Sequence, residues 1–250
     1  MQIVAAAAKD HGAGIIVHND AQHFSAGVDL NAFRAMIEAQ NWDSIDGFLW
    51  RFQMAVKALK YAPVPVVGAP SGLGVGGGFE VLAHCDKLVV HSNSILGLVE
   101  SAVGVVPSGG GVKESYLRWH QQTGSWEEAA WKCWMNIGYA ATGSSPELSA
   151  RLQYFRPDQD ETIMNRDRLL PRAIALVGEL SVNYQPPQPP KVQLAAVSLA
   201  DKMADFMQAG VDKGDFMPHD KTTAMAIASI MVQSAGDAAN VDEDTLYARE

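Results

Sequence analysis

The segment from Pro63 to Ser92 limits the fold of this chain more than any other stretch. It reads as a β-branched run (PVPVVGAP), a glycine-rich turn (SGLGVGGG), a helix (GGFEVLAHCD) and a second β-branched run (KLVVHS). Strand, turn, helix and strand in this order are typical of parallel strands joined by a crossover helix. The sequence therefore predicts an α/β fold.

The flanking sequence extends this pattern in both directions. Gly14 to Asn19 predicts a short buried strand, Asn31 to Tyr61 a helical region, and Ser94 to Ser101 a fourth short strand. The chain becomes mostly helical after Pro107, and Met1 to Asp10 is expected to form the end of a helix. Tryptophans at helical spacing in this part favour packing over a ligand cage: they are Trp119, Trp126, Trp131 and Trp134.

A proline-rich stretch divides the sequence. YQPPQPP, from Tyr184 to Pro190, stops helices and stiffens the chain. We predict a core over residues 1–184, a linker over 185–190 and a helical region over 191–250. The last part is expected to form two or three helices, interrupted at GVDKGDFMPHD, which predicts a solvated turn and not a calcium loop.

Composition excludes several classes of protein. The 250 residues carry a net charge of −9 with no basic cluster, which argues against nucleic-acid binding. Cys85 and Cys133 are far apart and lack metal-ligand spacing, so we expect buried reduced thiols and no metal site. No signal peptide or membrane span is apparent. We expect a soluble, cytoplasmic protein.

Gly72, Gly74 and Gly77 match the G-x-G-x-x-G pattern of dinucleotide-binding turns. Such a turn requires an acidic residue at the end of the next strand, about 20 residues further on, to hold the ribose hydroxyls. That strand ends here in His91, Ser92 and Asn93. The sequence therefore predicts that the chain does not bind NAD.

Glycines at the start of a helix can instead expose their backbone N–H groups. These groups and the helix dipole favour negative charge, including the charge of an oxyanion formed during a reaction. Glu80 lies in the first turn of the same predicted helix. Taken alone, this carboxylate fits favourable helix-end electrostatics and catalysis equally well.

Three segments together resemble the crotonase, or enoyl-CoA hydratase/isomerase, superfamily. They are FSAGVDL (Phe24 to Leu30), GLGVGGGFEVLAHCD (Gly72 to Asp86) and LGLVESAVGVVPSGGGVKE (Leu96 to Glu114), in the family's order and nearly at its spacing. The resemblance covers roughly Ile15 to Tyr184. It implies a ββα spiral core followed by a helical C-terminal region.

The resemblance also implies roles for individual residues. Ala26 and Gly77 correspond to the family's two oxyanion-hole N–H groups, and Glu80 and Glu100 correspond to the two catalytic glutamates of hydratases. The family usually has a proline before the second glutamate, where this chain has Val99. The family's coenzyme A contact, mostly through backbone, falls on four residues: Ser25, Ala26, Asp29 and Leu30.

One subgroup matches over more of the sequence. PSGGGVKE, MNRDRLLPRAIAL and the proline-rich stretch resemble the C-terminal hydratase part of long 3-hydroxyacyl-CoA dehydrogenases of fatty-acid oxidation. The chain lacks their NAD-binding domain and the first strands usual in crotonases, so it is either a fragment or a shortened relative. A dehydrogenase domain is thus a possible partner in a longer protein.

The function implied is hydration of an enoyl-CoA thioester, with coenzyme A as part of the substrate and no separate cofactor. Alternatives are an enoyl-CoA isomerase, another crotonase reaction, or a non-catalytic acyl-CoA-binding module. Homo-oligomers are expected because crotonases commonly form trimers. Among other candidates, we interpret His84 as packed, Asp86 as a structural partner and Ser108 as a turn residue without a hydrolase setting.

Overall fold

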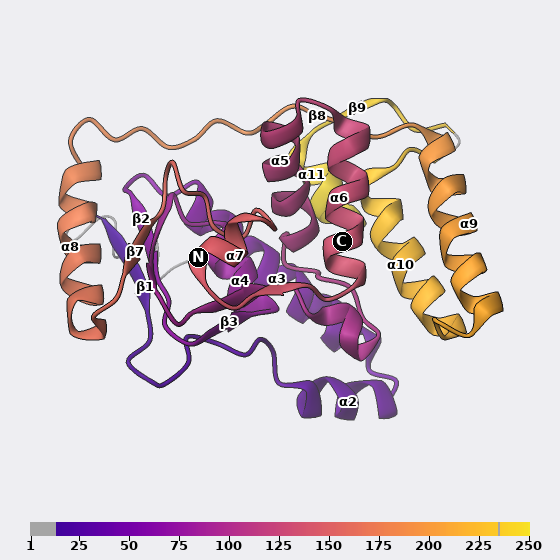
Figure 1. The fold of residues 1–250 in the computed structure, drawn as a ribbon, viewed down its shortest axis with the longest axis horizontal. Helices are drawn as coiled ribbons and strands as arrows, with labels where there is room; N and C mark the ends of the chain where they lie inside the picture. Colours follow the sequence, from indigo (N-terminus) through magenta and orange to yellow (C-terminus); the bar gives the residue numbers. More distant parts are fainter. Residues whose placement is uncertain (1–13, 235) are drawn as a thin grey trace. The chain divides into compact units, whose positions relative to one another are not determined.

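The computed structural model describes residues 14–234 and 236–250 (Figure 1). These residues form two compact units. Unit 1 comprises the described residues up to Leu96 together with Gly143–Gln188, and unit 2 comprises Gly97–Thr142 and Pro189–Glu250. The chain passes from unit 1 to unit 2 inside the proline-rich stretch, but residues 97–142 group with the segment after that stretch and not with the core. The helix expected before Asp10 lies outside the described residues.

Unit 1 contains a parallel sheet, a group of short strands and several helices. In chain order its elements are β1 (Ile15–His18), α2 (Leu30–Glu38), α3 (Trp42–Lys60), β2 (Val66–Ala69), β3 (Leu73–Val75), α4 (Gly77–Ala83), β4 (Lys87–His91), α7 (Pro146–Ala150), β7 (Glu161–Ile163), the 3₁₀ helix η2 (Arg166–Arg168) and α8 (Leu169–Leu180). The chain moves between the units within β5 (Ile95–Gly97) and β6 (Thr142–Gly143).

The main sheet has the strand order β1-β2-β4-β7, and all its pairs are parallel. Its central strand β2 is buried along its whole length. A Cβ added to Gly68 would lie 2.7 Å from Leu88 and 2.8 Å from Leu82 of α4, so this face of β2 packs directly against a helix. Coverage of both faces explains why the run VVGA contains no polar residue.

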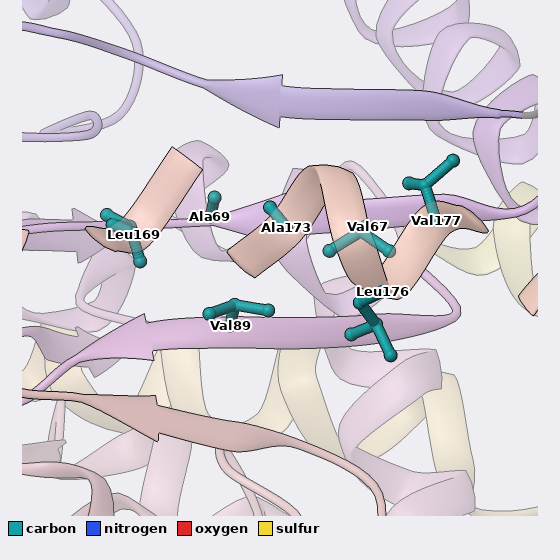
Figure 2. Close-up of a cluster of buried hydrophobic side chains, with 7 residues drawn as sticks. All are labelled: Val67, Ala69, Val89, Leu169, Ala173, Leu176 and Val177. Carbon is teal, nitrogen blue, oxygen red and sulfur yellow. The ribbon is translucent and has the colours of Figure 1, made fainter. Parts of the chain in front are cut away.

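The opposite face of the sheet packs against α8 (Figure 2). Leu169, Ala173, Leu176 and Val177 recur at helical spacing on α8 and form one apolar stripe. This stripe contacts three strand residues, which are Val67, Ala69 and Val89. The stripe fixes α8 on the sheet, because its apolar surface is removed from water only in this position.

The strands repeat a ββα order that builds a spiral. β2 joins the main sheet, β3 joins a second sheet with the order β3-β5-β6, and α4 follows. In the same way, β4 joins the main sheet and β5 joins the second sheet. In the first turn of the spiral, β1 joins the main sheet, and Ser25, which follows it, forms an isolated parallel bridge with Gly74 of β3 in the second sheet. The strand order and the helices that follow are the ββα spiral core and helical C-terminal region that the sequence predicted.

Unit 2 is mostly helical. Its elements are the 3₁₀ helix η1 (Glu100–Val103), α5 (Gly111–Thr123), α6 (Trp126–Gly138), the short strands β8 (Val192–Gln193) and β9 (Asn240–Val241), α9 (Val197–Lys213), α10 (Pro218–Met231) and α11 (Glu243–Arg249). Trp134 of α6 is buried, and its indole N–H donates to the carbonyl of Ala224 on α10 at 2.8 Å. The tryptophans thus pack helices together, as the sequence indicated.

Two details differ from the sequence-based expectation. The region from Asn31 to Tyr61 is two helices, α2 and α3, because Asn41 caps the second by accepting a hydrogen bond from the N–H of Ser44 at 3.2 Å. The strands β3 and β7 were not anticipated. Each has three residues, and that is too short for a periodic pattern.

Candidate active site

The loop after β1 is fixed by hydrogen bonds from side chains. The Asn19 amide donates to the carbonyls of His23 (3.2 Å) and Phe24 (3.0 Å), while its oxygen accepts from the N–H of Ala21 at 2.9 Å. Arg166 also donates to the carbonyl of Asp20 at 2.8 Å. These bonds set the direction in which the chain enters the Ser25 bridge.

The bridge brings the loop beside the glycine-rich turn. The N–H of Ser25 donates to the carbonyl of Leu73 at 2.8 Å, and the N–H of Val75 returns a bond to the carbonyl of Ser25 at 3.1 Å. A Cβ added to Gly78 would lie 2.6 Å from the Cβ of Ser25, so this approach requires glycine. Gly76 caps α4 with a φ of 57°, in the region that glycine adopts without strain.

Ala26 and Gly77 are brought together by this arrangement. A Cβ added to Gly27, the residue after Ala26, would lie 3.5 Å from the backbone nitrogen of Gly77. Within the described residues, no hydrogen bond engages the N–H of Ala26 or of Gly77. A cavity of about 370 Å³ lies over this place, lined by residues of both segments and by Phe52 of α3.

Glu80 sits one turn into α4, below the same glycines. Its side chain is buried, with the residue only 3% exposed, and its N–H donates to the carbonyl of Gly76 at 3.0 Å. The Nδ1 atom of His84 hydrogen-bonds the carbonyl of Glu80 at 2.6 Å, which holds the end of this short helix. Unit 1 therefore places a buried carboxylate on the helix whose first residue is Gly77.

Glu100 belongs to unit 2, where it begins η1. The carbonyl of Glu100 accepts a hydrogen bond from the N–H of Val105 at 3.2 Å, and Ser101 donates from its hydroxyl to the carbonyl of Ile137. The Oε2 atom of Glu100 is buried and has no hydrogen-bond partner among the described residues. Burial raises the pKa of this carboxyl to about 7. Groups with such values exchange protons readily near neutral pH.

The residues predicted to contact coenzyme A have local structural partners. The Ser25 hydroxyl accepts from the N–H of Gly27 at 3.1 Å, and Asp29 caps α2 by accepting from the N–H of Asn31 at 2.9 Å. Leu30 is the first residue of α2 and is 52% exposed. Backbone groups and the exposed Leu30 side chain therefore remain as the contacts this loop offers to a ligand.

The three spaced glycines do not form a dinucleotide turn. Such a turn joins a strand directly to a helix, whereas β3 lies between Gly72 and Gly77 and pairs with its neighbours. The strand β4 ends at His91, whose Nδ1 atom contacts Asn93 at 2.5 Å. No carboxylate stands at that position.

The remaining candidates have structural roles. His84 is buried, and the Asp86 carboxylate accepts from the N–H of Val66 (2.7 Å) and the hydroxyl of Tyr184 (3.0 Å). The Ser108 hydroxyl donates to the carbonyl of Val106 at 2.9 Å. Among the described residues no cluster of side chains could hold a metal ion, and no helix is long and apolar enough to cross a bilayer.

Sequence reasoning missed Asn19 and Phe52. Asn19 orders the loop that carries Ala26, and Phe52 lines the cavity from α3. The position of Asn19 between a strand and a polar loop is a weak signal for a turn stabilised by its side chain. Nothing in the sequence distinguishes Phe52 from the other apolar residues of its helix.

Comparisons with known proteins agree with this fold. A family model described as enoyl-CoA hydratase/isomerase matches residues 2–124. A probable 3-hydroxyacyl-CoA dehydrogenase of Bacillus subtilis is 31% identical over 182 residues, which are 72% of this chain and 23% of that protein. A putative fatty acid oxidation complex trifunctional enzyme of Rickettsia felis is 32% identical over 47% of this chain and 16% of its own length.

Solved structures show the same fold at low identity. An enoyl-CoA hydratase from Polaromonas sp. JS666 superposes with a TM-score of 0.59 at 16% identity, over 89% of this chain and 75% of that one. A putative enoyl-CoA hydratase from Thermobifida fusca, solved in complex with CoA, gives 0.55 at 18% identity, over 90% and 79%. The chain belongs to the crotonase (enoyl-CoA hydratase/isomerase) family. It spans about a quarter or less of the two curated relatives described above.

Proposed function

We propose that this chain adds water across the α,β double bond of an enoyl-CoA thioester. The observation that carries the proposal is in unit 1. Gly77 and the two neighbours of Ala26, Ser25 and Gly27, line a cavity, and within the described residues no hydrogen bond engages the N–H groups of Ala26 and Gly77. The buried Glu80 stands on the same helix as Gly77. Two donors aimed at one oxygen suit the enolate-like charge that hydration places on a thioester carbonyl.

The reaction needs one proton to leave water and another to reach carbon. The water oxygen bonds to the β-carbon as one carboxylate takes its proton, and the double-bond electrons move toward the carbonyl oxygen. The α-carbon then takes a proton from a carboxyl group. Glu80 and Glu100 are proposed for these two tasks from the family resemblance, and the raised pKa of Glu100 fits such a role.

The decisive experiment measures crotonyl-CoA hydration by the chain and its variants. Glu80→Gln and Glu100→Gln are each expected to lower kcat by about 10² to 10⁴, since glutamine keeps the size but cannot exchange the proton. Glu127→Gln, an exposed carboxylate on α6, is the matched control and should retain full activity. Circular dichroism verifies folding. Full activity of either catalytic-site variant contradicts the two-carboxylate mechanism.

A backbone variant tests the oxyanion proposal separately. Gly77→Pro removes the N–H donor and should reduce hydration further than loss of one carboxylate. Binding of a saturated acyl-CoA should persist if the variant folds, because the other contacts remain. Hydration at the original rate would remove Gly77 from the mechanism.

The second candidate is an enoyl-CoA isomerase, which shares the oxyanion hole but shuttles only one proton. Two glutamates in matching positions favour hydration over this reaction. A non-catalytic acyl-CoA-binding module would bind the thioester without turnover. The relatives named as 3-hydroxyacyl-CoA dehydrogenase and trifunctional enzyme support a role in fatty-acid oxidation, with a dehydrogenase domain as partner.

A further inference from the structure

A cavity of about 290 Å³ lies inside unit 2, and the described residues that line it all belong to this unit. Four of them are aromatic and come from α6, from its C-cap, from α9 and from the turn before α10; they are Trp134, Tyr139, Phe206 and Phe216. Asp220, in the first turn of α10, carries the only formal charge among the described lining residues. The cavity therefore combines aromatic rings with one carboxylate.

The aromatic wall is held by contacts between successive rings. Trp134 meets Phe206 edge-on at 5.7 Å between ring centroids. Phe216 lies 6.1 Å from Phe206 and 6.0 Å from Tyr139, again between centroids. A Cβ added to Gly210 would lie only 2.1 Å from the ring of Phe216, so the glycine lets this ring pack against α9. The wall is therefore formed before any ligand binds.

The polar side chains of the lining offer acceptors rather than donors. The one indole N–H of the lining donates to a backbone carbonyl at 2.8 Å, and the hydroxyls of Ser101 and Thr223 also donate to backbone carbonyls. One oxygen of the Asp220 carboxylate accepts from the N–H of Met217 at 2.8 Å, and within the described residues no hydrogen bond or ion pair engages the other oxygen. Apart from the Tyr139 hydroxyl, the described lining side chains have acceptor atoms left for a ligand and no donor.

The helix ends around the cavity add to its negative charge. Residues of the last turn and C-cap of α6, including Met135, Gly138 and Tyr139, line the cavity, and the C-terminus of a helix carries about half a negative charge. The N-terminus of α10 brings about half a positive charge, but Asp220 stands there with a full negative charge. The sum is a surplus on the order of one negative charge.

A positive charge is the complement of these walls. Aromatic rings and a carboxylate both attract a cation, whereas an anion would meet the charge of Asp220. We propose that the cavity is a binding site for a small organic cation, an alkyl or quaternary ammonium ion. The site lies wholly within unit 2, and the proposal does not depend on the hydratase function proposed above.

The volume of the cavity limits the size of the ligand. A water-sized group takes up about 30 Å³, so the cavity holds roughly eight to ten non-hydrogen atoms. Choline, a quaternary ammonium ion with a short hydroxyethyl arm, is within this limit. Its neutral isostere 3,3-dimethylbutan-1-ol has a carbon atom in place of the nitrogen, and therefore the same shape without the charge. This pair of probes separates recognition of charge from burial of apolar surface.

Asp220→Asn tests the carboxylate. The asparagine oxygen can still accept from the N–H of Met217, so the helix cap is retained. Choline affinity should fall by about fivefold, while affinity for the isostere should stay within about twofold. Asp215→Asn is the matched control, because Asp215 is an exposed residue of unit 2 that does not line the cavity. It changes the net charge equally and should leave choline affinity unchanged.

Phe216→Leu tests the aromatic wall, because it removes a ring and keeps an apolar side chain. Choline affinity should fall by about three- to tenfold, with little change for the isostere. Phe216→Tyr keeps the ring and should bind choline as the unmodified chain does. Phe33→Leu is the control, because Phe33 is a half-buried aromatic residue of α2 in unit 1 and lies outside this cavity.

Isothermal titration calorimetry of the full chain with both probes measures these affinities, and circular dichroism verifies the folding of each variant. We expect choline to bind the unmodified chain with a Kd on the order of 1 mM or below, and at least about tenfold more tightly than the isostere. Added NaCl should weaken the binding of choline and not that of the isostere.

Several outcomes would overturn the cation site. One is equal affinity for choline and the isostere, and another is the absence of choline binding at concentrations on the order of tens of millimolar. Undiminished choline binding in Asp220→Asn or in Phe216→Leu would place the ligand elsewhere and remove this cavity as the site. If Phe216→Leu does not fold, Asp220→Asn decides alone. None of these measurements involves crotonyl-CoA, so the hydratase proposal stands or falls separately.

Discussion

Each unit contains a buried cluster, and the two clusters are of different kinds. In unit 1, the cluster between α8 and the parallel sheet consists of aliphatic groups such as Val67, Val89 and Leu169 (Figure 2). In unit 2, the start of α5 buries the ammonium of Lys113 with carboxylates of Glu114 and Glu243. Aliphatic packing depends on side-chain volume, whereas buried ion pairs also depend on pH. We therefore expect mutations in the two clusters to lower the free energy of unfolding with different pH dependence.

The polar cluster of unit 2 is bonded at several points. Lys113 Nζ lies 2.7 Å from a Glu243 oxygen and 4.3 Å from the centroid of the Tyr247 ring. Glu250 accepts hydrogen bonds from the N–H groups of Gly110 (2.5 Å) and Lys113 (2.6 Å). Burial raises the pKa of Glu250 to about 8. One buried ammonium among several carboxylates ties α11 to α5.

The largest effect is expected from Lys113→Met. Removing the ammonium takes the Lys113 counter-charge away from buried carboxylates, which costs about 3 to 5 kcal/mol in the free energy of unfolding. Urea denaturation at neutral pH measures the loss. The loss should shrink in acid, where the carboxylates gain protons.

The triple variant Lys113→Met, Glu114→Gln, Glu243→Gln is the control. Neutralising the partners should recover most of the lost stability, since the penalty comes from uncompensated charge. A triple variant as unstable as Lys113→Met alone would show that side-chain packing, not charge, sets the cost.

The second effect concerns the apolar cluster of unit 1. Leu169→Ala should lower the free energy of unfolding by about 3 kcal/mol, because it removes a fully buried side chain and leaves a cavity. This loss should not depend on pH. Ile174→Ala, which alters an exposed residue of the same helix, should change stability by less than about 0.5 kcal/mol. A strong pH dependence of the Leu169→Ala effect would contradict the comparison.

The smallest effect, of opposite sign, is expected at Glu100. Its pKa of about 7 in the folded chain exceeds the ordinary value of 4.5, so the native state holds this proton more tightly than the unfolded chain does. The contribution of Glu100 to stability is therefore fully present below pH 4.5 and is lost as pH rises from 4.5 to 7. Glu100→Gln removes this loss and should gain up to about 3 kcal/mol above pH 7.

Denaturation of Glu100→Gln and the unmodified chain across this pH range measures the gain. Glu127→Gln, an exposed glutamate of unit 2, should follow the unmodified chain at every pH. If Glu100→Gln shows the same pH profile as the unmodified chain, Glu100 is not held in a desolvated state.

Local patterns were sufficient to predict the parallel strands and the glycine-rich turn. The run VVGA and the central LVV of KLVVH are apolar because both faces of the main sheet are covered, so consecutive residues carry the signal. Glycines at positions 76 to 78 indicate a close backbone approach, because a Cβ on Gly78 would collide with Ser25. The family resemblance placed Ala26 and Gly77 in one site, and the structure brings their segments together through the Ser25 bridge.

Only the tertiary structure decided the features that join distant parts of the chain. The grouping of residues 97–142 with the last sixty or so residues depends on helix contacts across a long sequence separation, which carry no local signal. Contacts between residues far apart in the sequence also produce three further features of unit 2. They are the desolvation of Glu100, the ion pairs of Lys113 and the cavity lined by Trp134. The burial of a side chain depends on the residues that folding places around it. The type and spacing of a residue in the sequence therefore specify its chemistry but not its surroundings.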